Sequence, residues 1–440
     1  MSAAEQIDER TVPPARSRRA LVAGSVGNFI EWYEFGVYGF LATIIAKNFF
    51  STAGGSDLEA LIKTYASFAL AFFFRPVGAA VFGRIGDRIG RRPTLILVLL
   101  LMSGATTLIG VLPTYSTIGF AAPILLTLIR ILQGLSAGGE FGGAVSVMTE
   151  FAPPGRRGLF GSWQSFTVAL GLLFGAAVSA LLALTLTTEQ LTAWGWRIPF
   201  LLALPMGLVA LWLRLKLEET PSFRRVEQAG SPSAAVVATP SAWETTKAIA
   251  VGIGRLMGWS AAGYTFLVVI PAYLQTSLNA TFVQALTATV LANAGFAATI
   301  IPAGVLSDRV GRRAVMLTGT ILIVVLALPL LNILQDPSGS VALKGAGVFI
   351  AGAVVGLIAG PGPAMLSEMF PTTVRYTGLG LAYSLSNAVF SGSAGLIITS
   401  LIGATENVDI PAYYVMAVGA VSALALATLR SDAHRRALRD

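Results

Sequence analysis

Six ionisable side chains stand inside long apolar stretches of this 440-residue chain, and their types indicate the chemistry they can do. Moving a charge into apolar surroundings costs free energy, so residues of this kind are candidates for function. A carboxyl group in such a place favours its neutral form and binds and releases a proton near neutral pH. A guanidinium stays protonated and holds a carboxylate through two parallel hydrogen bonds. The six residues are Glu31, Glu34, Arg75, Arg130, Glu140 and Arg255.

Two of the carboxylates belong to the first apolar stretch, residues 20–46. Glu31 lies about eleven residues into it, roughly 16 Å at the rise of a helix, which is near the middle of a membrane. Glu34 is one helical turn further on, and Tyr38 continues the same face. We predict that Glu31 and Glu34 bind and release a proton. The alternative is a carboxylate that is permanently paired with an arginine.

The buried arginines are candidates for holding an anion. Arg130 lies about twelve residues into its apolar stretch, so it is also near the middle of the membrane. We predict a part for it in both proton coupling and substrate binding, unless it is a structural partner of Glu31 or Glu140. Arg75 and Arg255 are predicted to bind substrate, although Arg255 is near enough to a helix end to snorkel to water instead. Glu140 either pairs with Arg75 or forms a second proton station.

Aromatic side chains in the same stretches suggest a second mode of binding. The faces of aromatic rings attract cations and can cage a quaternary ammonium group. Aromatic residues at helical spacing are more often packing or lipid-facing, so this alternative stays open. The candidates for a cage are Trp32, Tyr33, Trp163, Trp259 and Tyr264. The predicted substrate-binding set as a whole is Glu31, Tyr38, Arg75, Arg130, Trp163, Gln164, Arg255 and Tyr264.

The composition argues against most enzyme chemistry. The chain has no cysteine, and its single histidine, His434, belongs to the charged C-terminal tail. Thiolate nucleophiles, histidine-based triads and Cys or His metal clusters are therefore excluded as probable chemistry. No phosphate-binding glycine motif follows a strand, so ATP drive is not expected. We predict a protein that is not an enzyme, that has no metal or cofactor and that uses the proton as its coupling ion.

The elements that position these residues are membrane helices. Apolar residues make up 55% of the chain, charged residues only 12%, and the mean hydropathy is +0.74. A soluble protein carries about twice that charge, so we expect an all-α integral membrane protein. Twelve apolar stretches predict twelve transmembrane helices in two six-helix bundles. They lie near residues 20–46, 60–83, 94–112, 118–149, 159–186, 196–215, 247–276, 281–306, 314–334, 344–368, 374–402 and 410–430.

The distribution of positive charge fixes the expected orientation. Of the Lys and Arg residues, 23 fall on the side that carries both termini and four on the other. The positive-inside rule makes the first side cytoplasmic, in the plasma membrane. The net charge of +8 follows this topology and does not indicate nucleic acid. The predicted parts are a cytoplasmic tail at 1–19, a six-helix bundle at 20–215, a cytoplasmic linker at 216–246, a second bundle at 247–430 and a cytoplasmic tail at 431–440.

A repeat links the two bundles. Residues 83–92 (Gly-Arg-Ile-Gly-Asp-Arg-Ile-Gly-Arg-Arg) recur at 304–313 as Gly-Val-Leu-Ser-Asp-Arg-Val-Gly-Arg-Arg, and each copy is followed by a Glu and an Arg seven positions apart. An Asp can cap a helix and an Arg can bridge to the Glu, so the set predicts a breakable latch between the bundles. The alternative is a solvated basic loop. The predicted gating residues are Gly83, Asp87, Arg91, Glu150, Arg157, Asp308, Arg312, Glu368 and Arg375.

These motifs carry a family resemblance. Residues 83–92 and 304–313 resemble the signature of the major facilitator superfamily. Residues 27–38 (Gly-Asn-Phe-Ile-Glu-Trp-Tyr-Glu-Phe-Gly-Val-Tyr) are similar to the first helix of the metabolite:proton symporters, and further matches are residues 74–78, 133–140, 194–200 and 217–221. The resemblance covers residues 20 to about 430. It implies a symporter in which two bundles rock around a site at the membrane midplane, and in which helices 1, 5 and 7 border the cavity.

The expected function is therefore proton-coupled import of a small carboxylate-bearing metabolite by alternating access. The first choice of substrate is an organic acid such as a di- or tricarboxylate or 2-oxoglutarate, because residues 378–392 look more like the 2-oxoglutarate and citrate members. The alternative is a zwitterionic osmolyte such as proline or glycine betaine. The expected partners are substrate, protons and membrane lipids, with no nucleic acid, around a monomer. A passive channel or a receptor with a transporter fold is a different class that stays open.

Overall fold

The structure is a computed structural model that describes residues 14–51, 55–89, 91–150, 152–153, 155–215 and 241–431. The regular secondary structure in these ranges is helical throughout. The predicted tails at 1–19 and 431–440 and the predicted linker at 216–246 fall mainly outside the described residues. Their placement therefore stays a prediction.

The first half of the chain forms six successive crossings, several of them interrupted. A crossing often consists of two or three helical pieces that continue one another. The pieces are α1 (Pro14–Phe40), α2 (Ala42–Ile45) and η1 (Ala46–Phe50); α3 (Asp57–Ile89); α4 (Arg91–Val111); α5 (Tyr115–Ile118), α6 (Ala121–Ala137) and α7 (Glu140–Glu150); α8 (Arg157–Thr185); and α9 (Thr188–Gln190), η2 (Leu191–Gly195), α10 (Arg197–Leu201) and α11 (Ala203–Leu215).

The second half repeats this arrangement. The segments η3 and η4, like η1 and η2 in the first half, are short π-helical turns within longer helices. The pieces are α13 (Ala242–Tyr264), η3 (Thr265–Val269) and α14 (Ile270–Leu278); α15 (Phe282–Val310); α16 (Arg312–Gln335); α17 (Val341–Ala359) and α18 (Gly362–Met369); α19 (Thr372–Ser386), η4 (Asn387–Gly392) and α20 (Ala394–Thr405); and α21 (Ile410–Ala427).

Ten helices of the described chain are long and apolar enough to cross a membrane, and Ile96–Val111 is a shorter apolar helix. The first helix is not among the ten because Asn28, Glu31 and Glu34 lower the hydropathy of α1. It nevertheless runs alongside the others and packs against α8 and α11. Together these helices make the twelve crossings that the sequence predicts, and the predicted fold class is confirmed.

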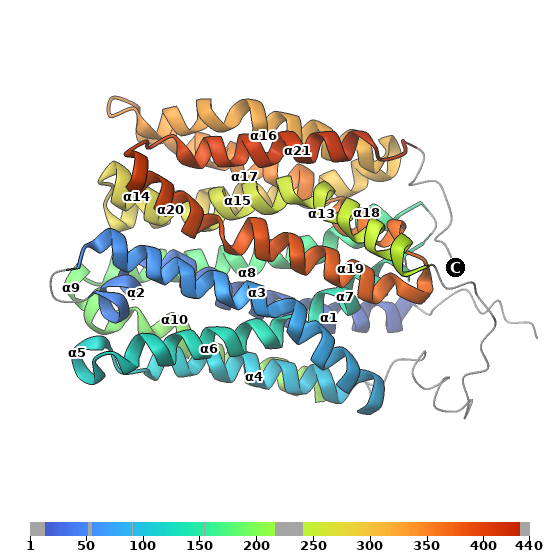
Figure 1. Ribbon diagram of the computed structural model, residues 1–440, viewed down its shortest axis with the longest axis horizontal. Coiled ribbons are helices and arrows are strands. Elements are labelled where there is room, and N and C mark those ends of the chain that lie inside the picture. The colour runs from blue at the N-terminus through green and yellow to red at the C-terminus, as the bar shows by residue number, and fades with distance from the viewer. Residues whose placement is uncertain are drawn as a thin grey trace, which may run out of the picture.

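The helices run roughly parallel along the long axis of the molecule (Figure 1). α1 begins and α21 ends at the same end of the bundle, which we call the terminal face; the other end is the opposite face. The two halves meet along α8 and α15, along α3 with η4 and α20, and along α7 with α19. Residues near the middle of α1, α8, α13 and α19 are therefore placed between the halves.

Close helix crossings rest on glycines. A Cβ atom on Gly134 of α6 would overlap the backbone carbonyl of Ala71 in α3, and one on Gly78 of α3 would overlap that of Leu135. Because both contacts are to backbone, no side-chain movement could relieve them. The crossing brings α3 against α6 where these helices carry Arg75 and Arg130, so it fixes the depth of both guanidinium groups.

Candidate functional site

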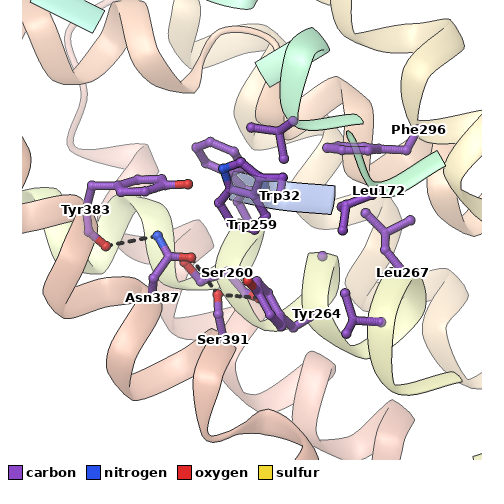
Figure 2. Close-up of a pocket in the computed structure, with 13 residues that line it drawn as sticks. Trp32, Leu172, Trp259, Ser260, Tyr264, Leu267, Phe296, Tyr383, Asn387 and Ser391 are labelled. Carbon is purple, nitrogen blue, oxygen red and sulfur yellow. Dashed lines mark hydrogen bonds between the residues drawn. The ribbon is translucent and has the colours of Figure 1, made fainter. Parts of the chain in front are cut away.

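A small cavity of about 30 Å³ lies between the two halves. That space is enough for one or two water molecules. Its wall is mainly aromatic and apolar, with a few hydroxyl and amide groups (Figure 2). The lining residues come from α1, α8, α13, η3, α15, α19 and η4, and they are Trp32, Val168, Leu172, Trp259, Ser260, Gly263, Tyr264, Leu267, Val268, Phe296, Tyr383, Asn387 and Ser391.

Four rings dominate the wall. Trp32 of the first half packs against Tyr264 of the second, with ring centroids 6.0 Å apart. Trp259 packs against Tyr383, also at 6.0 Å. The hydroxyl of Tyr264 is buried and has no hydrogen-bond partner in the structure. Such a wall offers several π faces and one free hydroxyl to whatever occupies the cavity.

The polar side of the wall comes from α13 and α19 with η4. The Ser391 hydroxyl donates to Asn387 Oδ1 at 2.8 Å and lies 3.1 Å from the Ser260 carbonyl. The Asn387 amide donates to the Tyr383 carbonyl at 3.0 Å. Asn387 and Ser391 lie in a π-helical turn, a distortion that is frequent at functional sites because it leaves backbone groups unpaired. These groups are neutral, so this side of the wall carries no formal charge.

Glu31 and Arg75 form a buried ion pair between α1 and α3, with Arg75 Nη2 3.0 Å from Glu31 Oε1. The guanidinium carbon of Arg75 lies 4.3 Å from the ring centre of Phe72 and 5.5 Å from that of Trp32. Arg75 Nε has no hydrogen-bond partner. The pair therefore lies directly behind Trp32, which lines the cavity. Its two charges cancel, so the pair carries no net charge.

Glu34 belongs to a second buried network. Arg130 Nη1 donates to Gln133 Oε1 at 2.6 Å, and Gln133 Nε2 donates to the Thr106 hydroxyl at 2.5 Å. The Thr106 hydroxyl in turn donates to Glu34 Oε2 at 2.6 Å. Glu34 Oε1 and the Nε and Nη2 atoms of Arg130 are buried without a hydrogen-bond partner. Glu34 and Arg130 are thus linked through two neutral side chains.

Tyr38 lies beside this network. The guanidinium carbon of Arg130 is 4.1 Å from the centre of the Tyr38 ring, and the Tyr38 hydroxyl is 2.6 Å from the hydroxyl of Ser67. Arg130 also lies over the rings of Phe35 and Phe68. Aromatic rings partly compensate a buried guanidinium. The structure therefore brings together Glu31, Glu34, Tyr38, Arg75 and Arg130, which the sequence predicts for proton coupling or for substrate binding.

Glu140 forms a buried ion pair with an arginine of α11. Glu140 Oε1 lies 2.5 Å from Arg214 Nη2, at the end of α11. The alternative in which Glu140 pairs with Arg75 is wrong, because Arg75 is paired with Glu31. The other alternative, a second proton-binding role for Glu140, stays a prediction. Arg130 likewise has neither Glu31 nor Glu140 among its hydrogen-bond partners.

Of the eight predicted substrate-binding residues, only Tyr264 lines the cavity. Glu31, Tyr38, Arg75 and Arg130 lie in the buried networks described above, and the other three lie elsewhere. Trp163 is 40% exposed, and its indole N–H donates to Ser25. Gln164 lies at the packing interface of α8 with α1, where it is next to Asn28. Arg255 is directed to α21, where it hydrogen-bonds the Ala425 carbonyl at 3.4 Å and the Thr428 hydroxyl at 3.1 Å. All three contact other helices or the surface instead.

The aromatic candidates divide in the same way. Trp32, Trp259 and Tyr264 line the cavity. Tyr33 is turned the other way, and its hydroxyl donates to the Pro199 carbonyl in α10 at 2.6 Å. Tyr383, Asn387 and Phe296 also line the cavity and were not predicted from the sequence. The available signal was the run of Tyr, Ser and Asn within the apolar residues 378–392.

Several side chains of the latch predicted for the second half lie together at the terminal face. The Asp308 carboxylate accepts the backbone N–H groups of Gly158 and Leu159, at the start of α8, at 2.7 and 2.9 Å. Arg312 pairs with Asp308 at 2.7 Å and with Glu368 at 3.1 Å. Because Gly158 belongs to the first half and Asp308 to the second, these bonds hold the two bundles together.

Two further gating candidates lie at this cluster. Arg157 Nη1 is 3.6 Å from Glu368 Oε1. Arg375 is buried, and its Nε donates to the carbonyls of Ser367 and Phe370 at 3.2 Å each. The first-half gating candidates Gly83, Asp87, Arg91 and Glu150 have side chains outside the described part of the structure. Their role stays a prediction.

The chain is similar to known transporters along its whole length. Residues 20–250 match the family described as Sugar (and other) transporter, and residues 253–439 match the Major Facilitator Superfamily. The proline/betaine transporter of Escherichia coli K12 is 34% identical over 436 residues, covering 97% of this chain and 86% of that protein. An inner membrane metabolite transport protein of the same organism is 35% identical over 437 residues, covering 97% of each.

Two further comparisons extend this result. The ectoine/proline transporter of Corynebacterium glutamicum is 33% identical and covers 95% of this chain and 85% of its own length. The partially occluded, inward-open xylose transporter of Escherichia coli superposes with a TM-score of 0.74 at 18% identity, covering 93% of this chain and 97% of that one. At this identity the structural likeness concerns the fold alone.

Proposed function

Since the chain belongs to the metabolite:proton symporters of the major facilitator superfamily, we propose that it carries a small zwitterion of the proline and glycine betaine class across the membrane together with protons. The relatives that are named for proline, betaine or ectoine favour this substrate over the organic acid that the sequence placed first. The organic acid is therefore the second candidate here.

The observation that carries the proposal is the aromatic cavity. Trp32, Trp259, Tyr264 and Tyr383 surround the space between the halves, and each ring contact with an alkylated ammonium group is worth about 0.5–2 kcal/mol. The guanidinium of Arg75, which lies behind Trp32, is already neutralised by Glu31. A net-neutral zwitterion suits such a site, whereas a dianion or trianion finds no unpaired positive charge among the lining residues.

The ion pair also supplies a means of coupling. A proton on Glu31 removes its charge and frees Arg75 to bind the carboxylate of the substrate. The substrate then replaces Glu31 as the partner of Arg75, so the protonated form of the protein binds substrate more tightly. By linkage the bound substrate favours protonation of Glu31 to the same extent. Glu34 and Arg130 form a second proton-responsive pair in this proposal.

Alternating access requires that the halves separate at one face at a time. At the terminal face Asp308 holds the start of α8. Toward the opposite face, Thr43 of α2 donates to Gln275 of α14 at 3.1 Å. We propose that these two sets of contacts break in turn. We further propose a monomer in the plasma membrane, surrounded by lipid, with both termini in the cytoplasm, that moves its substrate without altering it and needs no cofactor besides the proton.

Uptake by purified protein in proteoliposomes tests the substrate. With an imposed proton gradient, we expect glycine betaine and proline to accumulate above their external concentration, and 2-oxoglutarate and citrate not to. Trp259→Leu should raise the KM for glycine betaine roughly tenfold through the lost ring contact. Trp163→Leu is the matched control, because Trp163 lies at the surface, and its KM should not change. Accumulation of the organic acids alone would reject the zwitterion.

Glu31→Gln tests the coupling. The variant should exchange internal for external substrate but lose uphill accumulation, because its side chain can no longer take up a proton. Glu59→Gln is a suitable control, since Glu59 is exposed and pairs only with Lys63 in the same helix. If Glu31→Gln still accumulated substrate to the full extent against its gradient, Glu31 would not be the residue that couples transport to the proton. A protein that never concentrates any solute against its gradient would be a channel or a receptor.

A further inference from the structure

One contact between the halves lies between the cavity and the terminal face, apart from the charged cluster around Asp308. Phe141 of α7 and Tyr383 of α19 stack face to face, with ring centroids 3.4 Å apart and planes at 5°. Both side chains are buried, at 6% and 4% exposure. Phe141 belongs to the first half and Tyr383 to the second, so this stack has to come apart whenever the halves separate there.

The backbone geometry permits this stack. A Cβ atom on Gly380, one turn before Tyr383, would lie 3.9 Å from the Cα atom of Gly142. The two helices thus approach through a pair of glycines, and the neighbouring large rings meet without an intervening side chain. Phe141 stands nine residues before the end of α7, roughly 14 Å from the terminal face.

Tyr383 is also part of the cavity wall. Its ring packs on Trp259, and Figure 2 shows its hydroxyl end directed toward Trp32 and Trp259. Among the lining residues of α19 and η4 it is the nearest to the terminal face, because Asn387 and Ser391 follow one and two turns further along the helix. Tyr383 therefore touches the cavity on one side and the closing ring on the other.

We propose that the stack of Phe141 on Tyr383 is the gate that closes the cavity toward the terminal face, and that Tyr383 transmits occupancy of the cavity to this gate. A ligand that packs against Tyr383 changes the position or the rotamer of the ring on which Phe141 rests. In this arrangement the charged cluster around Asp308 holds the two bundles together, while the two rings close the path from the cavity to the terminal face. The inference rests on the proposed transport function, in which the cavity opens to each face in turn.

A chain without cysteine offers a direct test. A single cysteine at the cavity, Ser260→Cys, is exposed to a membrane-impermeant maleimide from either side of sealed vesicles. Two reference variants show which face of the protein points out of the vesicle. Ser241→Cys lies before α13 at the terminal face, and Ser338→Cys lies in the exposed loop after α16 at the opposite face. We expect slow labelling of Ser260→Cys from the terminal face, because the rings close that path.

Adding Phe141→Ala should raise the labelling rate from the terminal face roughly tenfold, as expected for the loss of one buried aromatic pair, and leave the rate from the opposite face unchanged. Tyr383→Leu should act in the same direction. Tyr383→Phe keeps the stacked ring and should label like the parent. Phe200→Ala, which removes a fully buried ring of α10 away from the cavity, controls for general loosening and should not raise the rate.

Two results would contradict the proposal that the two rings form a gate. One is an unchanged labelling rate from the terminal face in both Phe141→Ala and Tyr383→Leu. The other is an equal increase in Phe200→Ala, which would make the effect a consequence of lost stability. Labelling needs no substrate, so a failed gate and a wrong substrate assignment give different results. If the labelling rates changed as expected but the protein did not take up glycine betaine, only the proposed substrate would be wrong.

Discussion

At the scale of single residues, the hydroxyl of Thr106 has an unusual position. It donates to the Glu34 carboxylate and accepts from the Gln133 amide, whose oxygen receives Arg130. A hydroxyl is suited to this because it is a donor and an acceptor at once. Thr106 therefore decides how strongly the buried cation of α6 and the buried carboxylate of α1 are linked.

Thr106→Val keeps the shape of the side chain and removes both hydrogen bonds. Each buried group left without a partner costs about 1–3 kcal/mol, so we expect a clear fall in the melting temperature and a loss of proton-driven uptake. Thr107→Val is the matched control, because the Thr107 hydroxyl bonds only the Ser103 carbonyl of its own helix. Thermal unfolding in detergent and uptake in proteoliposomes measure the two effects. Equal losses in both variants would contradict a special role for Thr106.

Arg255 gives a second prediction at this scale. Its bonds to Ala425 and Thr428 tie α13 to the end of α21, away from the cavity. Arg255→Ala should therefore lower stability by about 1–3 kcal/mol, as for a lost hydrogen bond to a charged group, with little change in substrate affinity. Binding measured by isothermal titration, beside a thermal melt, separates the two. A large loss of affinity without loss of stability would restore the substrate-binding role predicted from the sequence.

At the scale of elements, the position of Arg75 depends on how closely α3 crosses α6. Gly134→Ala would place a methyl group against the Ala71 carbonyl, and the helices would have to move apart. Such overpacking costs about 1–3 kcal/mol, and it would also shift Arg75 relative to Glu31. We expect a lower melting temperature together with weaker proton coupling, measured as the ratio of uphill accumulation to exchange.

Gly104→Ala is the control for that change. Gly104 is a helical glycine of α4 with open space where its Cβ would be, so alanine there should be neutral or slightly stabilising. A Gly134→Ala variant as stable and as well coupled as Gly104→Ala would show that the crossing tolerates separation. The proposed dependence of the ion pair on this crossing would then be wrong.

The elements also show how far a sequence can predict this molecule. Hydropathy and the distribution of positive charge are sufficient to predict twelve helices and their division into two halves. The reason is that a helix must be apolar over about 20 residues to cross a membrane, which is a strong signal in the sequence. These two features are not sufficient for the rotation of a helix about its axis. Lipid is as apolar as a helix interface, so the lipid-facing and buried faces of α8 and α13 carry similar residues. Trp163 and Arg255 were therefore predicted to face the cavity, and the structure turns both away from it.

The pairing of the buried charged residues could be identified only from interatomic distances in the structure. Sequence spacing placed Glu31, Glu34 and Arg130 in one functional group, and the structure brings them near one another. The sequence offered Glu140 as the partner of Arg75, whereas the structure pairs Arg75 with Glu31 and Glu140 with Arg214, because spacing along the chain does not determine which helices face one another. Thr106 and Tyr383 were not singled out at all. An isolated threonine or tyrosine in an apolar helix has no pattern, and only its neighbours in space reveal its use.

At the scale of the whole molecule, the two ends of the bundle are closed by different chemistry. The terminal face has a charged cluster in which Asp308 accepts two backbone N–H groups of α8, while the contacts toward the opposite face include the neutral Thr43–Gln275 hydrogen bond and the apolar contact of Leu58 with Gly403. A carboxylate at a helix N-terminus is stabilised by the helix dipole and by its hydrogen bonds. The free energy of closing the terminal face therefore depends strongly on one side chain.

Asp308→Asn keeps the size of this side chain and removes its charge, so it weakens both the helix cap and the pair with Arg312. Because the cavity itself is untouched, the variant should lose turnover severalfold while its substrate KM stays within about twofold. Initial rates of uptake over a range of substrate concentrations give both values. Asp336→Asn, in the exposed loop after α16, is the control, and it should change neither. If Asp308→Asn instead raised the KM at an unchanged maximal rate, the cluster would act on substrate binding, and the halves would need another device to hold the terminal face closed.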